Sequence, residues 1–168
     1  MNPKKNWKKY LVLVVTLLFG VSIAAQSVIA SGTEEDPYII GMDQTFTPFT
    51  FIDVDGEPAG IEVDIVEAVA EDQGFHYQFQ VFSFSAALQA LESGQIDGMV
   101  AGMAVTPERA ANFDFSTPYF SFGNQFAVPP ESPIETVEDL HGATVSTKTG
   151  STGLQIAKIC KMNMILIY

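Results

Sequence analysis

Short apolar runs and helical patterns alternate along this chain, and that alternation is the feature that most constrains its fold. Helical spacing of apolar residues predicts one helix that ends at Gly74 and a second at Ser85–Ser93. Strands are predicted by the apolar runs Tyr38–Met42, Thr50–Ile52, His76–Phe82, Ile96–Met103, Gln125–Val128 and Thr144–Ser146. Strands that alternate with helices at this interval predict an α/β domain with a largely parallel sheet.

The charged residues are distributed unevenly and exclude some classes of partner. The chain has 20 acidic and 8 basic residues, and four of the bases are lysines in the first nine positions. Between Glu34 and Asp139, Arg109 is the only base. Binding of phosphate groups needs clustered lysine and arginine, so nucleic acid and anionic membrane surfaces are not expected partners.

Residues 1–30 have the three-part pattern of a secretory signal: a basic start, the apolar run Leu11–Ala25 and small residues before Ser31. We exclude this segment from the fold and expect cleavage after Ala30. A retained membrane anchor is the alternative. Either way, the rest of the chain is expected outside the cytoplasmic membrane, in the periplasm or at the cell surface. The lone Cys160 predicts no disulfide.

Metal and catalytic motifs are not predicted. The acids from Asp53 to Glu57 lack the later ligands of a calcium loop, and Asp55-Gly56 between strand-like runs predicts a hairpin turn. His76 and His141 have no companion ligands at metal-binding spacing. The chain has no G-x-S-x-G nucleophile motif and no phosphate-binding G-K-[ST] loop, so we expect no cofactor and no catalytic residue.

Arg109 is a candidate ligand residue. Thr106-Pro107 predicts a helix start directly after the strand at Ile96–Met103. Helix starts at the carboxyl ends of strands bind small anions in open α/β sheets, and a guanidinium holds a carboxylate through two parallel hydrogen bonds. The alternative is a surface arginine paired with Glu108 or Asp114.

Other candidates follow the predicted strands. Thr149-Gly150-Ser151-Thr152-Gly153 precedes the helical pattern Leu154–Lys158, so its backbone N–H groups and the Thr152 hydroxyl can bind an anion, or it is a plain junction. Phe46 and Phe84 are either core residues or walls of an apolar cleft in which Asp43 meets a polar group.

Ordered motifs cover residues 36–157. They are Asp43-x-x-Phe46-x-Pro48-Phe49, Gly60-Ile61-Glu62-Val63-Asp64-Ile65, Leu88-x-x-Leu91-x-Ser93-Gly94-x-Ile96-Asp97, Ala101-Gly102-Met103-x-x-Thr106-Pro107-Glu108-Arg109, Phe113-Asp114-Phe115-Ser116-x-Pro118-Tyr119 and Asp139-Leu140-x-Gly142. In order and spacing they resemble the bacterial extracellular solute-binding proteins of family 3, the receptors of polar amino-acid ABC importers. The resemblance implies a type II periplasmic-binding fold, with two α/β lobes that close on one amino acid.

The resemblance also implies roles for individual residues. Arg109 resembles the clamp for the ligand carboxylate, with Thr152 and nearby backbone amides as further donors. Phe46 and Phe84 match the aromatic residues that sandwich the ligand.

Three further positions belong to the implied site. Asp43 matches a side-chain contact of several members, and the Gly102 carbonyl matches a contact to the ligand ammonium. Ala104 departs from the family, because members usually have a serine or threonine there. Loss of that hydroxyl weakens binding by about 1 kcal/mol if its partner stays solvated.

The resemblance divides the chain into four parts. Residues 1–30 are the signal peptide, 31–124 are a mostly present first lobe, 125–158 begin an incomplete second lobe, and 159–168 match nothing expected. We therefore expect a truncated or frame-disrupted member of the family. Its binding is expected to be weak or absent, because family members supply a second-lobe carboxylate for the ligand ammonium.

The function implied by the resemblance is the extracytoplasmic substrate-binding component of an amino-acid ABC importer. Such a component is expected to be a monomer that binds a polar amino acid and delivers it to a permease in the cytoplasmic membrane. An enzyme of the same architecture, a cyclohexadienyl or arogenate-type dehydratase, and an inactive remnant are the alternatives.

Overall fold

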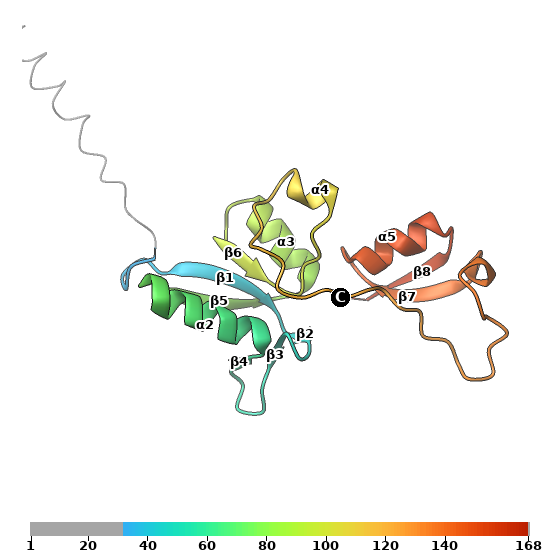
Figure 1. The fold of residues 1–168 in the computed structure, drawn as a ribbon, viewed down its shortest axis with the longest axis horizontal. Helices are drawn as coiled ribbons and strands as arrows, with labels where there is room; N and C mark the ends of the chain where they lie inside the picture. The colour runs from blue at the N-terminus through green and yellow to red at the C-terminus, as the bar shows by residue number, and fades with distance from the viewer. Residues whose placement is uncertain (1–31, 168) are drawn as a thin grey trace, which may run out of the picture. The chain divides into compact units, whose positions relative to one another are not determined.

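The computed structural model describes residues 32–167, whose helices and strands are drawn in Figure 1. The predicted signal segment, its cleavage after Ala30 and the alternative of a membrane anchor lie outside the described residues. Within the described range, no helix is both long enough and apolar enough to cross a membrane.

The central sheet is parallel, as predicted. It consists of β1 (Tyr38–Asp43), β5 (Tyr77–Phe82) and β6 (Gly98–Val100), in the order β5-β1-β6. All six residues of β1 pair with β5, and Ile40, Gly41 and Met42 also pair with β6. Because β1 is the middle strand, its carboxyl end is enclosed on both sides: Met42 and Asp43 are buried.

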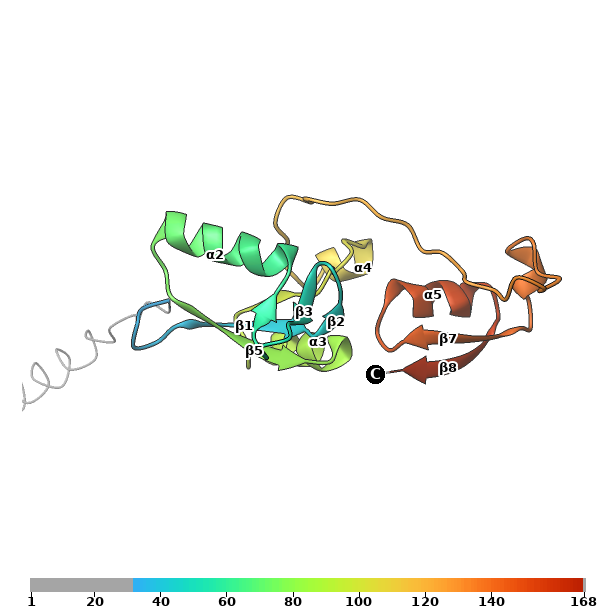
Figure 2. The same ribbon diagram turned by 90° about the horizontal axis from the view of Figure 1, so that it is seen from below.

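Two helices connect these strands. Helix α2 (Ile61–Gln73) ends at Gly74, which has the left-handed conformation expected of a helix-terminating glycine. Helix α3 (Phe84–Glu92) begins after Ser83, whose hydroxyl accepts a hydrogen bond from the Ala86 N–H. The chain runs from β1 through α2 to β5 on one side of β1, and then through α3 to β6 on the other side of β1. Because these two connections run in opposite directions, the two helices cover opposite faces of the sheet (Figure 2).

A small antiparallel sheet follows β1. It is formed by β2 (Thr45–Phe46), β3 (Thr50–Ile52) and β4 (Pro58–Ala59). Asp53 organises the turn between β3 and β4, since its Oδ1 accepts hydrogen bonds from the backbone N–H groups of Asp55 and Glu57, both at 2.9 Å. The predicted hairpin turn is therefore confirmed. Across residues 32–167 no group of three or more His, Cys, Asp or Glu side chains is placed to hold a metal ion.

The last part of the chain is a β-α-β unit. The 3-10 turn η1 (Glu138–Leu140) leads to β7 (Thr144–Lys148), α5 (Thr152–Ile159) and β8 (Asn163–Ile167), and β8 pairs in parallel with β7. Leu140, Ala157 and Met162 form a buried cluster beneath these elements. No element was predicted after residue 158. The structure has a strand there because the apolar run finds an unpaired neighbour in β7.

Two other predictions differ from the structure. Gln125–Val128 is not a strand, since it lies in an exposed segment with no strand partner among the described residues and ends at two prolines. The strand predicted at Ile96–Met103 is limited to β6, because the chain leaves the sheet before Gly102, where φ is +58°. The predicted helix start at Thr106 is confirmed: α4 (Pro107–Ala110) begins there.

Gly60 joins the small sheet to α2, and its conformation is predicted to be essential. Its φ is +123°, and an added Cβ would overlap the Phe49 carbonyl, which accepts a hydrogen bond from the Glu62 N–H at 3.0 Å. We expect Gly60→Ala to lower the free energy of unfolding by about 3 kcal/mol in chemical denaturation. Gly56→Ala is the matched control, because Gly56 also has a positive φ but has open space around it. Its expected cost is about 1 kcal/mol, and equal losses for the two variants would contradict the packing explanation.

Candidate functional site

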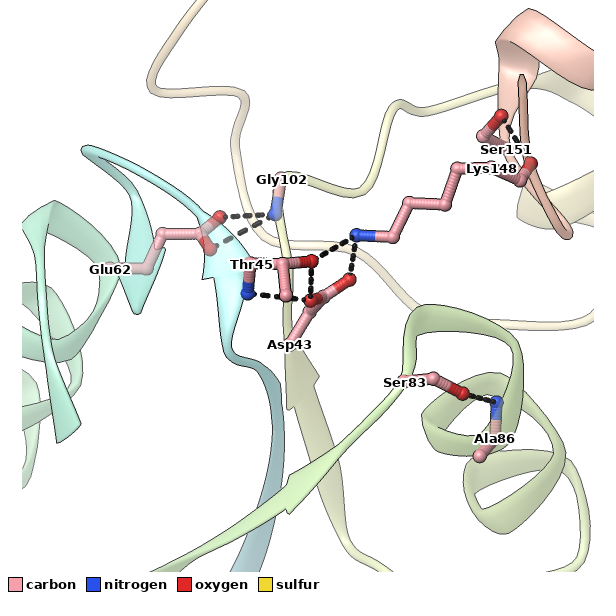
Figure 3. A network of polar contacts seen from close by, with 8 residues as sticks. All are labelled: Asp43, Thr45, Glu62, Ser83, Ala86, Gly102, Lys148 and Ser151. Carbon is pink, nitrogen blue, oxygen red and sulfur yellow. Dashed lines mark hydrogen bonds and ion pairs between the residues drawn. The ribbon is translucent and has the colours of Figure 1, made fainter. Parts of the chain in front are cut away.

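The carboxyl ends of β1 and β6 bring three of the predicted site residues to one edge of the sheet. Asp43 is the last residue of β1, whereas Gly102 and Ala104 follow β6. Phe84 begins α3 directly after the neighbouring strand β5. Ligands bind at this edge of open α/β sheets, outside the carboxyl ends of the strands. Figure 3 shows the polar contacts around Asp43 and Gly102.

Arg109 is buried at this edge, with only 6% of its surface exposed. Thr106 caps α4 by accepting a hydrogen bond from the Arg109 N–H at 3.2 Å. The guanidinium donates to the Ala104 carbonyl at 2.9 Å and to the Gly150 carbonyl at 3.0 Å. It thereby joins the loop after β6 to the loop before α5. Burial lowers the pKa of the guanidinium from its ordinary value, and the nearby Glu108 partly offsets that effect.

The alternative of an arginine paired with Glu108 or Asp114 is not what the structure contains. Among the described residues, the ion pair present is that of Lys148 with Asp43. Arg109 therefore keeps its positive charge without an acidic partner in hydrogen-bonding contact. Only two of the five N–H donors of a guanidinium are used by the carbonyls, so the group has donors left for a carboxylate.

Phe84 lies against the Arg109 guanidinium. Its ring centre is 5.4 Å from the Arg109 Cζ, a distance at which a cation is attracted to the face of an aromatic ring. Phe84 is 6% exposed, and a Cβ on Gly150 would be 3.5 Å from its ring. The ring therefore supports both Arg109 and the loop that contains Gly150.

Phe46 lies on another wall of the site. It stacks on Phe49 with ring centres 5.2 Å apart, and its ring covers Gly102, where an added Cβ would overlap it. A hollow of about 280 Å³ is lined by these three residues together with Ala104 and by Met103, Val105, Phe115, Ser116, Pro118, Tyr119, Phe120, Ser121 and Phe122. Mostly apolar walls with a few polar backbone groups are typical of small-molecule sites.

Asp43 is bound by a lysine that the sequence analysis did not single out. Lys148, at the end of β7, forms an ion pair with Asp43 and also donates to the Thr45 hydroxyl at 3.0 Å (Figure 3). Thr45 in turn donates its backbone N–H and its hydroxyl to Asp43, at 2.8 and 2.7 Å. Burial alone would raise the pKa of the Asp43 carboxyl, but the hydrogen bonds from Lys148 and Thr45 outweigh burial and hold the pKa below its usual value.

Thr152 is the first residue of α5, and its hydroxyl donates to the Asn124 side-chain oxygen at 3.3 Å. The residue that caps α5 is its neighbour Ser151, whose hydroxyl accepts the Leu154 N–H at 3.3 Å and donates to the Lys148 carbonyl at 2.8 Å. The loop before α5 is therefore ordered by Ser151, and Thr152 contacts the segment that precedes β7.

Glu62 is a second residue to which the sequence analysis gave no role, since it appeared there only within the motif Gly60–Ile65. It is 2% exposed, and both of its carboxylate oxygens accept the Gly102 N–H at 3.0 Å (Figure 3). Tyr119 also donates its hydroxyl to Glu62. Burial and this hydrogen bond raise the pKa of Tyr119, so its hydroxyl stays protonated and remains a donor.

These residues form an arrangement suited to binding rather than to bond cleavage. Ala104 connects the buried cation to the aromatic hollow: its carbonyl accepts from Arg109, and the residue lines the hollow, whereas Arg109 is not among the lining residues. Such groups can hold a small molecule that carries a carboxylate and an ammonium, because the guanidinium matches the first and carbonyl oxygens match the second.

Comparison with known proteins supports the same interpretation. The arginine-binding extracellular protein ArtP of Bacillus subtilis (strain 168) is 31% identical over 146 residues, which are 86% of this chain and 57% of that protein. The L-cystine-binding protein TcyJ of Escherichia coli (strain K12) is 30% identical over 145 residues, which are 83% of this chain and 54% of that protein. The chain thus spans just over half the length of these curated relatives.

Solved structures show the same fold. An ancestral arginine-binding protein bound to arginine has a TM-score of 0.65 and 33% identity, with 81% of this chain and 61% of that chain covered. An ancestral amino-acid-binding protein, described as a precursor of cyclohexadienyl dehydratase, has a TM-score of 0.71 and 30% identity over the same shares. Both likenesses confirm the type II periplasmic-binding architecture.

The family model for bacterial extracellular solute-binding proteins, family 3, matches residues 38–161. That range contains the parallel sheet, Arg109 and the loop before α5. The resemblance inferred from the sequence is confirmed, and the chain belongs to the bacterial extracellular solute-binding proteins of family 3.

Proposed function

We propose that this chain binds a polar amino acid outside the cytoplasmic membrane and delivers it to an ABC permease. The observation that carries the proposal is Arg109, a buried guanidinium that contacts two carbonyl oxygens and makes no ion pair within the described residues. A buried charge is costly unless it is compensated, so this position favours an anionic ligand group. The α-carboxylate of an amino acid supplies that group.

The rest of the site has proposed roles in the same complex. The ligand carboxylate replaces the Gly150 carbonyl on the guanidinium, and Thr152 turns its hydroxyl from Asn124 to the carboxylate. Phe84 supports the guanidinium from below. Phe46 covers the aliphatic part of the ligand, and its contact with Gly102 supports this role.

The remaining positions contact the two polar ends of the ligand. The Gly102 carbonyl accepts from the ligand ammonium. Ala104 has no side-chain hydroxyl for the ligand, and its role is to hold the guanidinium, since its backbone carbonyl accepts from Arg109. Asp43, with Lys148, faces the ligand side chain.

The division of the chain is part of the proposal. Residues 31–124 are the first lobe, 125–158 begin the second, and 159–168 are a C-terminal tail within which Asn163–Ile167 forms β8, with residues 1–30 as an export signal or a membrane tether. Export to the periplasm or cell surface agrees with the family description and with the names of the relatives. Action as a monomer and delivery to a permease are proposed with it.

Binding without turnover is proposed, because the relatives are named as binding proteins. The neighbour that preceded a dehydratase is itself described as an amino-acid-binding protein. Conversion of a cyclohexadienyl substrate by the full chain would contradict this part of the proposal.

Arg109→Gln tests the carboxylate clamp. We expect isothermal titration calorimetry of the full chain against the polar amino acids to find a ligand that binds weakly, as the missing second-lobe carboxylate implies. Arg109→Gln should weaken the binding of that ligand by about 100-fold, since a charge-assisted pair is lost. Lys158→Gln is the control, because Lys158 is an exposed base in α5. Unchanged affinity in Arg109→Gln, with a ligand that binds the unmodified chain, would exclude the clamp.

Lys148→Met tests the role of the Asp43 pair in selectivity. In the unmodified chain, Lys148 neutralises the carboxylate that a cationic side chain would use. Its removal leaves Asp43 unpaired, so we expect affinity for L-arginine to rise about tenfold relative to L-glutamine. The ratio of the two dissociation constants, with Lys158→Met as the control, measures this effect. A ratio that does not change would contradict the assigned role.

A further inference from the structure

The buried carboxylate of Glu62 lies one hydrogen bond behind the loop that forms the ammonium end of the proposed site. It belongs to the first turn of α2, is 2% exposed and makes no ion pair within residues 32–167. A buried charge without a counter-charge is costly, so such a group is retained where its charge has a use or its hydrogen bonds are complete.

The contacts of Glu62 aim its charge at Gly102. Both carboxylate oxygens accept the Gly102 N–H at 3.0 Å, so a full negative charge lies against the backbone at Ala101–Gly102. Gly102 has a φ of +58° and is covered by Phe46, which leaves the loop little freedom to turn away. The carboxylate therefore acts on a fixed segment of backbone rather than on solvent.

We propose that Glu62 is a positioning residue that supplies the negative counter-charge for the ammonium of the bound amino acid, acting across the backbone at Gly102. This inference rests on the proposed function, in which the Gly102 carbonyl accepts from that ammonium. Glu62 does not touch the ligand. Its negative charge lies one short stretch of backbone away from the proposed ammonium position and stabilises a cation there, since charges interact strongly where water is excluded.

The described part of the chain thereby contains an acidic partner for a zwitterion. Relatives of this family were expected to place a carboxylate from the second lobe on the ammonium directly. Glu62 is a different group in a different place, behind the sheet edge and covered by Tyr119. Its contribution is smaller than that of a direct ion pair, because a peptide group separates the charges.

The test compares ligands with and without the ammonium group. Two matched pairs serve as probes: L-glutamine with 4-carbamoylbutanoate, and L-arginine with 5-guanidinopentanoate. In each pair the second compound has hydrogen in place of the α-ammonium. Glu62→Gln keeps the shape of the side chain and an oxygen for the Gly102 N–H but removes the charge. We expect Glu62→Gln to lower the affinity for the amino acid by about tenfold and the affinity for the deamino compound by less than about twofold.

Glu71→Gln is the matched control, because it removes an exposed acid nine positions further along α2, about 13 Å away at 1.5 Å per residue. Glu71→Gln should leave the affinity for all four compounds unchanged. Tyr119→Phe is a second variant, which keeps the Glu62 charge and removes the hydroxyl that donates a hydrogen bond to it. We expect this variant to raise the ratio of affinities, amino acid over deamino compound, by about twofold.

The outcomes separate the two proposals. An unmodified chain that binds none of the four compounds overturns the proposed function and this inference with it. If the unmodified chain binds and Glu62→Gln lowers the affinity for both members of a pair equally, this inference alone is overturned. Glu62 is then only a support for the loop. If Glu62→Gln shows no cooperative thermal transition, a lower preference for the ammonium form in Tyr119→Phe overturns the inference instead.

Discussion

The parallel pairing of β1 with β5 and β6 is the constraint on which the site depends. Parallel strands end at the same edge, so residues more than fifty positions apart in the sequence meet there without any direct sequence signal. Asp43 ends the middle strand, Gly102 follows one neighbour and Phe84 follows the other. Each of these residues is then held by a second contact, from Lys148, Glu62 and Arg109 respectively.

Each of the few buried charged side chains is held by specific contacts. Asp43 is paired, Arg109 is held by carbonyls and an aromatic ring, and Glu62 is held by a peptide N–H and a phenol. A buried cation and a buried anion, neither in an ion pair within residues 32–167, contact the same segment at Ala104 and Gly102 and suit a ligand that carries both charges, which is the property of an amino acid. The acidic surface of the chain takes no part in this arrangement.

Much of the fold could be predicted from the sequence, since helix limits and turns depend on local residues. Gly74 ends α2, Thr106 starts α4 and Asp53 forms its turn, as expected. The predictions were wrong where strand formation depends on a pairing partner distant in the sequence. Gln125–Val128 has no strand to pair with among the described residues, whereas Asn163–Ile167 pairs with β7. In the site, Arg109 was found because it is isolated in an acidic stretch. Lys148 and Glu62 were missed because their roles depend on contacts 105 and 40 positions away.

Arg109 also offers the most direct test, because it is the only arginine in the chain and gives a single guanidinium signal in nuclear magnetic resonance. The measurement is the ¹⁵N and ¹H shift of its Nε–H group as the full chain is titrated with an amino acid that binds, and with the α-amide of that amino acid. The site described here predicts a large shift with the free carboxylate and little with the amide. An amino acid that binds while the Arg109 signal stays unmoved would contradict it.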